Sequence, residues 1–202
     1  MTSKPKNAVM IFIKNPVLGR VKTRLARTTS HGFALNLYHQ LLSGIRTKLL
    51  ELEDTRKFLF YEQYLPCVDQ WPDEEFIKIR QKGNRLHEKV QNAFSIAFDT
   101  DCRKALWIVP DCPSLKNYHL RFAFECLEKN DVVMGPTFDG GLYLLGMKEP
   151  YNKLLEHKEW GKGKLYRDLK NDCQKLGLSC YSLEKLQDID REEDIPRKKS
   201  IL

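Results

Sequence analysis

The fold is decided by Ala8-Val9-Met10-Ile11-Phe12-Ile13, which is followed at once by Lys14-Asn15-Pro16-Val17-Leu18-Gly19-Arg20-Val21-Lys22-Thr23-Arg24. The first run is short, apolar and rich in strand formers, which predicts a strand buried on both faces. Residues 33–52 then repeat leucine, isoleucine and tyrosine at helical spacing, so we expect a long amphipathic helix after the loop. A buried strand, a polar loop and a helix are the typical opening of an α/β fold.

The same alternation continues along the rest of the chain. Further strands are predicted at residues 57–61, 75–80, 105–109, 131–136, 142–146 and 179–183, and further helices at residues 86–98, 117–128 and 163–176. The strand at 142–146 follows the turn Thr137-Phe138-Asp139-Gly140-Gly141 and is expected to pair antiparallel. We therefore predict a three-layer αβα sandwich, with a mostly parallel central sheet and one antiparallel addition.

Length and composition indicate one globular domain over residues 1–202, since 42% of the residues are hydrophobic and 30% are charged. No apolar run approaches the roughly 20 residues of a spanning helix. The first residues also lack the features of a signal peptide. We therefore expect a cytoplasmic protein with no membrane partner. The six cysteines show no C-x-x-C spacing, so neither a disulfide framework nor a zinc site is expected.

The positive charge of the chain is concentrated near its start. The formal net charge is +7, and residues 1–50 hold nine Lys or Arg and no acid, whereas the remainder holds 25 basic and 27 acidic residues. Five of the nine lie between Lys14 and Arg27, without the interleaved aromatic residues of a single-strand binder. This distribution favours a small anionic ligand over nucleic acid as the partner.

The basic loop has the composition of a phosphate site. Gly19 permits close approach of the backbone to a ligand. Lys14, Arg20, Lys22 and Arg24 supply positive charge for the phosphate oxygens of a nucleotide. The alternative is an ordinary solvated basic loop. We favour the phosphate site because the loop directly follows a buried strand and no nearby acid balances it.

Three aspartates are candidates for chemistry. Asp111 comes after a predicted strand, where a carboxylate can bind Mg²⁺ or Mn²⁺, although it can equally cap the turn that follows. Asp139 is a candidate contact to the acceptor or the metal, or else part of a tight Asp-Gly turn. Asp190 is a candidate second metal ligand, or else part of a helix-start cluster with Asp188 and Asp194. A nucleophilic thiol at Cys112 is a further alternative, but no feature of the sequence marks it as activated.

Four motifs in order resemble those of the glycosyltransferase-A-fold proteins related to 2-phospholactate guanylyltransferase. They are Ile11 to Ala26, Asp111-Cys112-Pro113, Gly135-Pro136 with Asp139-Gly140-Gly141 and Tyr143-Leu144-Leu145-Gly146, and Asp188-Ile189-Asp190 with Glu193-Asp194. The resemblance covers nearly the whole chain. It implies the nucleotide-diphospho-sugar transferase fold, a phosphate site in the first motif, and Mg²⁺ or Mn²⁺ held by Asp111 and Asp190.

The resemblance also points to the residues around the nucleotide. It places Gln81 and Gly83 in the loop beside the base and implies catalytic roles for Lys22, Asp111 and Asp139. The chain departs from the family on this side. Val109-Pro110 stands where Gly-Thr or Gly-Ser is usual, Asn84 and His87 replace an Asp and a Gly, and Trp160-Gly161-Lys162 replaces Trp-Ser-Thr.

These observations lead to competing hypotheses for the function. The first is a divalent-metal-dependent transferase that uses a nucleoside triphosphate or a nucleotide-sugar together with an unknown acceptor. Within it, nucleotidyl transfer is slightly favoured by the likeness of the opening loop to the guanylyltransferase pattern. The alternatives are a catalytically weak nucleotide-binding module of the same fold, which the departures favour, and a nucleic-acid-binding domain.

Overall fold

The computed structural model describes residues 5–156, 158 and 160–196. The central sheet has seven strands in the order β3-β2-β1-β4-β6-β5-β7. β1 pairs parallel with both β2 and β4, and β6 is antiparallel to its neighbours β4 and β5. The predicted fold class is confirmed, including the antiparallel addition. The residues of the predicted domain at 1–4 and 197–202 lie outside the described part of the chain.

The elements follow the predicted pattern closely. The strands are β1 (Asn7–Ile13), β2 (Thr55–Tyr61), β3 (Phe76–Arg80), β4 (Lys104–Ile108), β5 (Val132–Pro136), β6 (Leu142–Met147) and β7 (Cys180–Ser182). The helices are α1 (Thr23–Ala26), α2 (His31–Leu50), α3 (Leu86–Phe98), α4 (Asn117–Lys129), α5 (Asn152–Leu155), α6 (Leu165–Lys175) and the 3-10 helix η1 (Glu192–Asp194). The short elements α1, α5 and η1 are additions to the prediction, because a single turn leaves no periodic signal.

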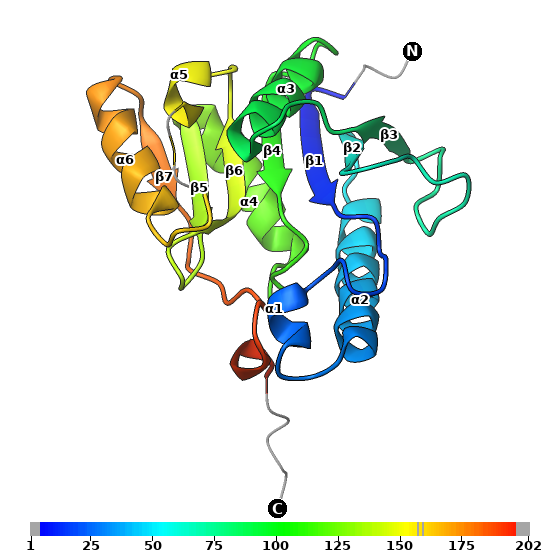
Figure 1. Ribbon diagram of the computed structural model, residues 1–202. Helices are drawn as coiled ribbons and strands as arrows, with labels where there is room; N and C mark the ends of the chain where they lie inside the picture. The colour runs from blue at the N-terminus through cyan, green and yellow to red at the C-terminus, as the bar shows by residue number, and fades with distance from the viewer. Residues whose placement is uncertain (1–4, 157, 159, 197–202) are drawn as a thin grey trace, which may run out of the picture.

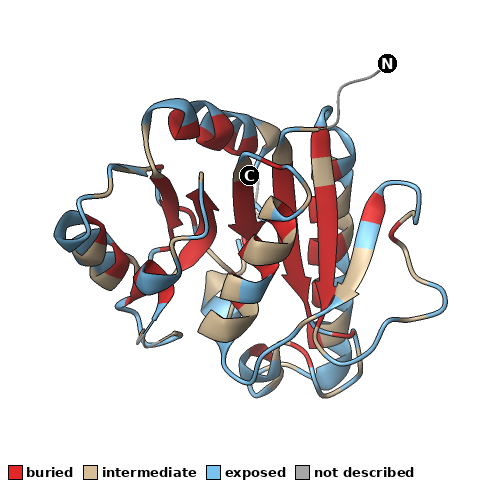
Figure 2. Cartoon of the chain, turned by 90° about the horizontal axis from the view of Figure 1, so that it is seen from above, coloured by how far each residue is buried: buried red, intermediate tan, exposed pale blue. Residues whose placement is uncertain are grey.

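Helices cover both faces of the sheet, and each face has its own core (Figures 1 and 2). α2 and α4 pack on one face, and α3, α5 and α6 pack on the other. β1 contributes to both cores because its residues alternate between the two faces and six of its seven residues are buried. The prediction of a strand buried on both faces is therefore correct. No helix of the described residues combines the length and apolarity needed to cross a membrane.

The connections bring distant segments to the carboxyl ends of β1 and β4. The C-terminal segment runs back across the molecule and lies beside α1, as Figure 1 shows in red and blue. The amide of Ile189 donates to the carbonyl of Asp111 over 3.0 Å, which ties this segment to the end of β4. In parallel sheets, ligands bind beyond the carboxyl ends of the strands, so this junction is where a site is expected.

Candidate functional site

A cleft of about 610 Å³ opens beyond the ends of β1 and β4, and we call it the strand-end cleft. It is lined by six of the predicted site residues, namely Lys14, Lys22, Arg24, Gln81, Asp111 and Asp190. The described residues Gly19, Arg20, Gly83 and Asp139 are outside this lining. The cleft is thus lined by residues from three predicted motifs: the basic loop, Asp111-Cys112-Pro113 and the closing acidic motif.

Lys22 is the most constrained residue of the strand-end cleft. Its φ of 46° and ψ of 43° are left-handed, a conformation that residues other than Gly, Asn and Asp rarely adopt. Its side chain is 5% exposed, and Nζ lies 2.8 Å from Oδ1 of Asp111. Nζ also donates to the carbonyl of Ile189 over 2.6 Å. Because these contacts hold a strained backbone in place, Lys22 is positioned by the fold rather than by the loop alone.

The loop before Lys22 is fixed to its surroundings by two buried side chains. The Tyr38 hydroxyl of α2 accepts from the amide of Lys14 over 2.9 Å and donates to its carbonyl over 3.2 Å. Asn15 is 4% exposed; its amide group donates to the carbonyl of Tyr64 over 2.9 Å, and its Oδ1 accepts from the amide of Gln63 over 3.0 Å. The Lys14 side chain remains exposed. A firmly held backbone therefore presents the exposed side chain of Lys14 to the cleft.

The carboxylates of Asp111, Asp139 and Asp188 lie close enough for their charges to interact. Burial, the charge of Asp139 and the charge of Asp111 together raise the pKa of Asp188 to about 6. The group is therefore destabilised as an anion and would be stabilised by a cation. Among the described residues no group of three His, Cys, Asp or Glu side chains is arranged to hold a metal by itself. Mg²⁺ usually binds one or two protein carboxylates together with water and substrate phosphates. Asp111, which lines the cleft, and Asp188, which is outside the lining but interacts electrostatically with Asp111, are candidates for these carboxylates.

Asp190 has a different environment from Asp188. Its Oδ2 lies 2.5 Å from Nη1 of Arg24, in an ion pair whose partners are 58% and 38% exposed. Asp194, the third member of the predicted cluster, accepts from the amides of Asp190 and Arg191 over 3.0 and 2.8 Å at the start of η1. Asp194 therefore has the predicted role at the start of a helix. Asp190 instead joins the C-terminal segment to α1 through its ion pair with Arg24.

Asp139 is committed to its own turn. Its Oδ1 accepts from the amide of Gly141 over 2.9 Å and also from the Thr137 hydroxyl. The amide of Thr137 donates to the carbonyl of Gly141 over 3.1 Å, which closes the hairpin between β5 and β6. The turn alternative for Asp139 is therefore supported, and the charge of Asp139 is also felt by Asp188 and Arg24. A contact of Asp139 with the acceptor or the metal stays a prediction.

The Cys112 thiol is buried in the core beside the sheet, with 3% exposure. Burial and the neighbouring Asp188 and Asp111 raise its pKa, which keeps the sulfur protonated. A nucleophilic thiolate needs the opposite environment. The structure therefore argues against the catalytic-thiol alternative.

The predicted base-side loop is held mainly by hydrogen bonds from side chains to backbone groups. Gln81 donates from Nε2 to the carbonyl of Phe60 over 3.1 Å. Gly83 has a φ of 116°, and a Cβ there would lie 2.8 Å from the Cβ of Glu88, so no other residue fits without rearrangement. Glu88 accepts from the amides of Asn84 and Arg85 over 2.7 and 3.2 Å and caps α3. Gly83 thus shapes the loop and stands back from the strand-end cleft.

The wall of the cleft holds an unsatisfied donor. Trp107 of β4 is 3% exposed, lines the cleft and has no hydrogen-bond partner for its buried Nε1 within the described structure. Its ring packs edge-on against Phe12 at 5.8 Å and Trp160 at 5.6 Å between centroids. Native proteins satisfy nearly all buried donors, so an unpaired indole in a cleft wall is a candidate ligand contact.

The sequence departures at Val109-Pro110 cause no backbone strain. The non-glycine residues with positive φ among the described residues are Lys22, Asp54 and Asp101. Both Val109 and Pro110 line the strand-end cleft. Val109-Pro110 therefore adds side chains to the cleft wall at positions whose backbone does not require glycine.

Neither Trp107 nor Asp188 was expected as a site residue from the sequence, where Asp188 belongs to a helix-start cluster and to the closing acidic motif of the family resemblance. Asp188 was visible as the first acid of Asp188-Ile189-Asp190, but nothing in a linear motif shows which acid interacts electrostatically with Asp111. Trp107 had one available signal, its position on the strand that leads into Asp111, four residues before it.

The chain is similar in sequence to a known nucleotidyltransferase. The chain is 26% identical over 141 residues to 2-phospho-L-lactate guanylyltransferase of Methanocaldococcus vulcanius, which covers 69% of this chain and 61% of that protein. The chain therefore spans less than two thirds of this relative.

Solved structures share the fold. A Desulfovibrio desulfuricans G20 protein assigned as a nucleotide-diphospho-sugar transferase superposes with a TM-score of 0.82 at 24% identity, over 92% of this chain and 83% of that one. The manganese complex of Rv0371c from Mycobacterium tuberculosis H37Rv superposes with a TM-score of 0.54 at 12% identity, over 95% and 96% of the two chains. The sequence model for the family described as "Uncharacterized protein conserved in bacteria (DUF2064)" matches residues 45–162, and the chain belongs to this family.

Proposed function

We propose that this protein is a divalent-metal-dependent nucleotidyltransferase that binds a nucleoside triphosphate in the strand-end cleft. The observation that carries the proposal is the contact of the buried Lys22 ammonium with Asp111, beside the destabilised carboxylate of Asp188. A cleft with fixed cations on one side and clustered carboxylates on the other suits a metal-bound polyphosphate. The name of the guanylyltransferase relative and the manganese complex of Rv0371c support this chemistry.

In the proposed complex, Asp111 and Asp188 would hold Mg²⁺ or Mn²⁺, with the ion and the phosphate replacing the contact between Lys22 and Asp111. Asp190 would keep its ion pair with Arg24. The ion would supply Lewis acidity at the phosphate oxygens. Lys22 would contact the phosphate from its fixed position, while Lys14 and Arg24 would bind the outer phosphate oxygens from the rim. These charges would stabilise the negative charge that builds on pyrophosphate as it leaves.

Thermal shift with GTP, in the presence and absence of Mg²⁺, tests the binding step. We expect a Mg²⁺-dependent rise in Tm for the wild type, and its loss in Asp111→Asn. Asp73→Asn is the matched control, since Asp73 is 82% exposed and pairs with Lys78 away from the strand-end cleft. A rise that does not depend on Mg²⁺ would favour the metal-independent binding module instead.

The identity of the leaving group tests the reaction class. Nucleotidyl transfer from GTP releases pyrophosphate, whereas glycosyl transfer from a nucleotide-sugar releases a nucleoside diphosphate. We expect pyrophosphate release when GTP and Mg²⁺ are supplied with a mixture of small phosphorylated and carboxylated alcohols. Release of GDP from a GDP-sugar, with no pyrophosphate from GTP, would reassign the protein as a glycosyltransferase.

A further inference from the structure

Two of the six cysteines lie together where α6 meets the edge strand β7 (Figure 1). Cys173 belongs to the end of α6, and Cys180 is the first residue of β7. The Cys173 side chain is enclosed in the core on this face of the sheet, with 1% exposure, and Cys180 packs against the same core from a half-exposed position. The two thiols share a hydrogen bond, which Cys173 donates to the Cys180 sulfur.

Hydrogen bonds hold the backbone on both sides of the pair. The carbonyl of Cys173 accepts from the amide of Leu178 over 2.9 Å. Ser179, next to Cys180, accepts at its carbonyl from the amide of Asp131 over 3.0 Å, and its own amide donates to the Asp131 carboxylate over 2.9 Å. The connection between the two cysteines is thus fixed at both ends, which keeps the sulfurs close together. A disulfide of about 2.05 Å needs a further approach, which falls to the half-exposed Cys180.

The two thiols differ in reactivity. The hydrogen bond from Cys173 lowers the pKa of Cys180, and the positive charge of Lys170 adds to this effect. Donation of the same hydrogen bond, together with burial, raises the pKa of Cys173. The thiolate is the form that reacts with oxidants, and Cys180 is also the thiol that solvent can reach. The pair therefore places an accessible, more acidic thiol beside a buried thiol that can react with its oxidised form.

We propose that Cys173 and Cys180 form a reversible disulfide when the protein meets hydrogen peroxide. The Cys180 thiolate attacks one peroxide oxygen; the S–O bond forms, the O–O bond breaks, and hydroxide leaves. The product is a sulfenic acid on Cys180. The Cys173 sulfur then attacks the Cys180 sulfur, the S–S bond forms, the S–O bond breaks, and the oxygen leaves as water with the Cys173 proton. The two thiols thus give two electrons to the peroxide, and a dithiol such as dithiothreitol reverses the bond.

The disulfide would fasten α6 to β7 and restrict the unfolded chain, which stabilises the folded state. α6 also supports the hairpin that carries Asp139. The amide of Tyr166 donates to the carbonyl of Gly140 over 3.1 Å, and the Tyr166 hydroxyl lies 2.9 Å from the Ser182 hydroxyl of β7. A covalent link between α6 and β7 would therefore reinforce the support of this hairpin.

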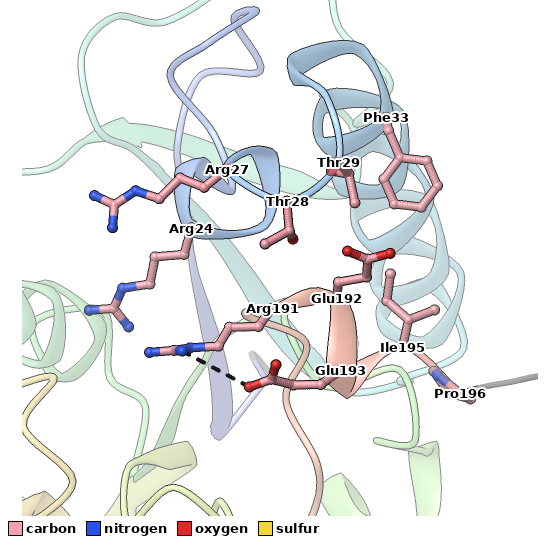
Figure 3. A pocket seen from close by; sticks show the side chains of 10 residues that line it. All are labelled: Arg24, Arg27, Thr28, Thr29, Phe33, Arg191, Glu192, Glu193, Ile195 and Pro196. Carbon is pink, nitrogen blue, oxygen red and sulfur yellow. Dashed lines mark ion pairs between the residues drawn. The ribbon is translucent and has the colours of Figure 1, made fainter.

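The thiol pair is separate from the site proposed for the nucleotide. Neither cysteine lines the strand-end cleft. Neither lines the neighbouring pocket of about 710 Å³, which lies between α1, the start of α2 and η1 (Figure 3). Oxidation of the thiols and binding of GTP are therefore independent measurements, and the failure of either proposal leaves the other in place.

Peptide mapping of the full chain after treatment with hydrogen peroxide tests the site. Trypsin cuts after lysine, so Cys173 and Cys180 fall in different peptides, residues 171–175 and 176–185. We expect these peptides to be linked within one chain and to separate on addition of dithiothreitol. The Tm of the oxidised form should be higher by roughly 5–10 °C. Unlinked peptides, or a link of either cysteine to the exposed Cys67, would overturn the proposal. A link with an unchanged Tm would overturn the fastening of α6 to β7.

Two variants separate the roles of the thiols. Cys180→Ser removes the nucleophile, so peroxide should leave its Tm unchanged. In Cys173→Ala the sulfenic acid on Cys180 has no thiol to react with, so dimedone should label Cys180 more than in the wild type. Cys126→Ala is the matched control, since Cys126 is buried in the core on the other face of the sheet and its loss should leave the link intact. Equal dimedone labelling in the wild type and Cys173→Ala would overturn the pairing.

Discussion

Two aspartates stand at opposite ends of the central sheet, and their surroundings differ. Asp111 follows β4 at the carboxyl end, and the Lys22 ammonium that reaches it belongs to a strained left-handed residue. Asp131 precedes β5 at the amino end, where the hydroxyl and the amide of Ser179 donate to its Oδ2 over 2.6 and 2.9 Å. Lys148 adds an ion pair at 3.3 Å.

The pKa shifts show the same contrast. The Ser179 hydroxyl is the main cause of the lowered pKa of Asp131, so this carboxylate is stabilised in the folded state. At the other end, Asp188 near Asp111 has its pKa raised by burial and by neighbouring negative charge. At the amino end of the sheet, the Asp131 carboxylate thus has hydrogen-bond and ion-pair partners. At the carboxyl end, Lys22 has a strained backbone and Asp188 is repelled by neighbouring carboxylates, which a bound cation and phosphate would relieve. Strained and crowded charges are typical of functional sites.

The largest expected effect is on turnover in Lys22→Met. The variant keeps the aliphatic stem but removes the charge that contacts Asp111, so we expect a loss of roughly 10²–10³ in kcat/KM for pyrophosphate release. Lys57→Met is the control for destabilisation, because Lys57 is equally buried and pairs with Glu75 away from the cleft. Comparable losses in both variants would mean that Lys22 acts through stability alone.

Asp188→Asn should have opposite effects on stability and ligand response. Removing one of several neighbouring carboxylates relieves repulsion, so we expect the Tm without ligand to rise by roughly 2–4 °C, which corresponds to about 1 kcal/mol. The same change should abolish the Mg²⁺-dependent shift with GTP. A lower Tm without ligand would contradict the contrast between the two ends of the sheet.

Ser179→Ala tests the amino end of the sheet, where the Ser179 hydroxyl donates to the Asp131 carboxylate. Loss of a hydrogen bond to an ionised carboxylate should lower the free energy of unfolding by about 1–2 kcal/mol at pH 7, with unchanged turnover. Because the folded pKa of Asp131 is depressed, its stabilisation is present above the unfolded pKa of about 3.9 and is lost as the pH falls. The deficit of the variant, measured by urea unfolding, should therefore shrink below about pH 4.

The fold could be predicted almost completely from the sequence, because buried strands and amphipathic helices have clear periodicity. β1 and α2 were placed within two residues of their observed starts. The site could be predicted only in part. The sequence shows that Lys22 and Arg24 are basic. It does not show that Lys22 pairs with Asp111 and Arg24 with Asp190, because these pairs depend on the path of the C-terminal segment. Such pairing depends on tertiary packing, which local sequence does not encode.

The smallest expected effect concerns the unpaired indole of Trp107 at the carboxyl end of the sheet. It tests whether a single buried donor at this end is satisfied by a ligand. Trp107→Phe keeps an aromatic ring between Phe12 and Trp160 but removes the buried Nε1 donor. If a bound nucleotide accepts from this donor, the affinity for GTP with Mg²⁺ should fall about two- to tenfold, as expected for one hydrogen bond. Trp71→Phe is the matched control, since Trp71 is also buried but lies outside the lining of the strand-end cleft. Equal GTP affinity in the wild type and Trp107→Phe would show that the indole makes no hydrogen bond either in the free protein or in the complex with GTP, because removal of the donor would then cost no binding energy.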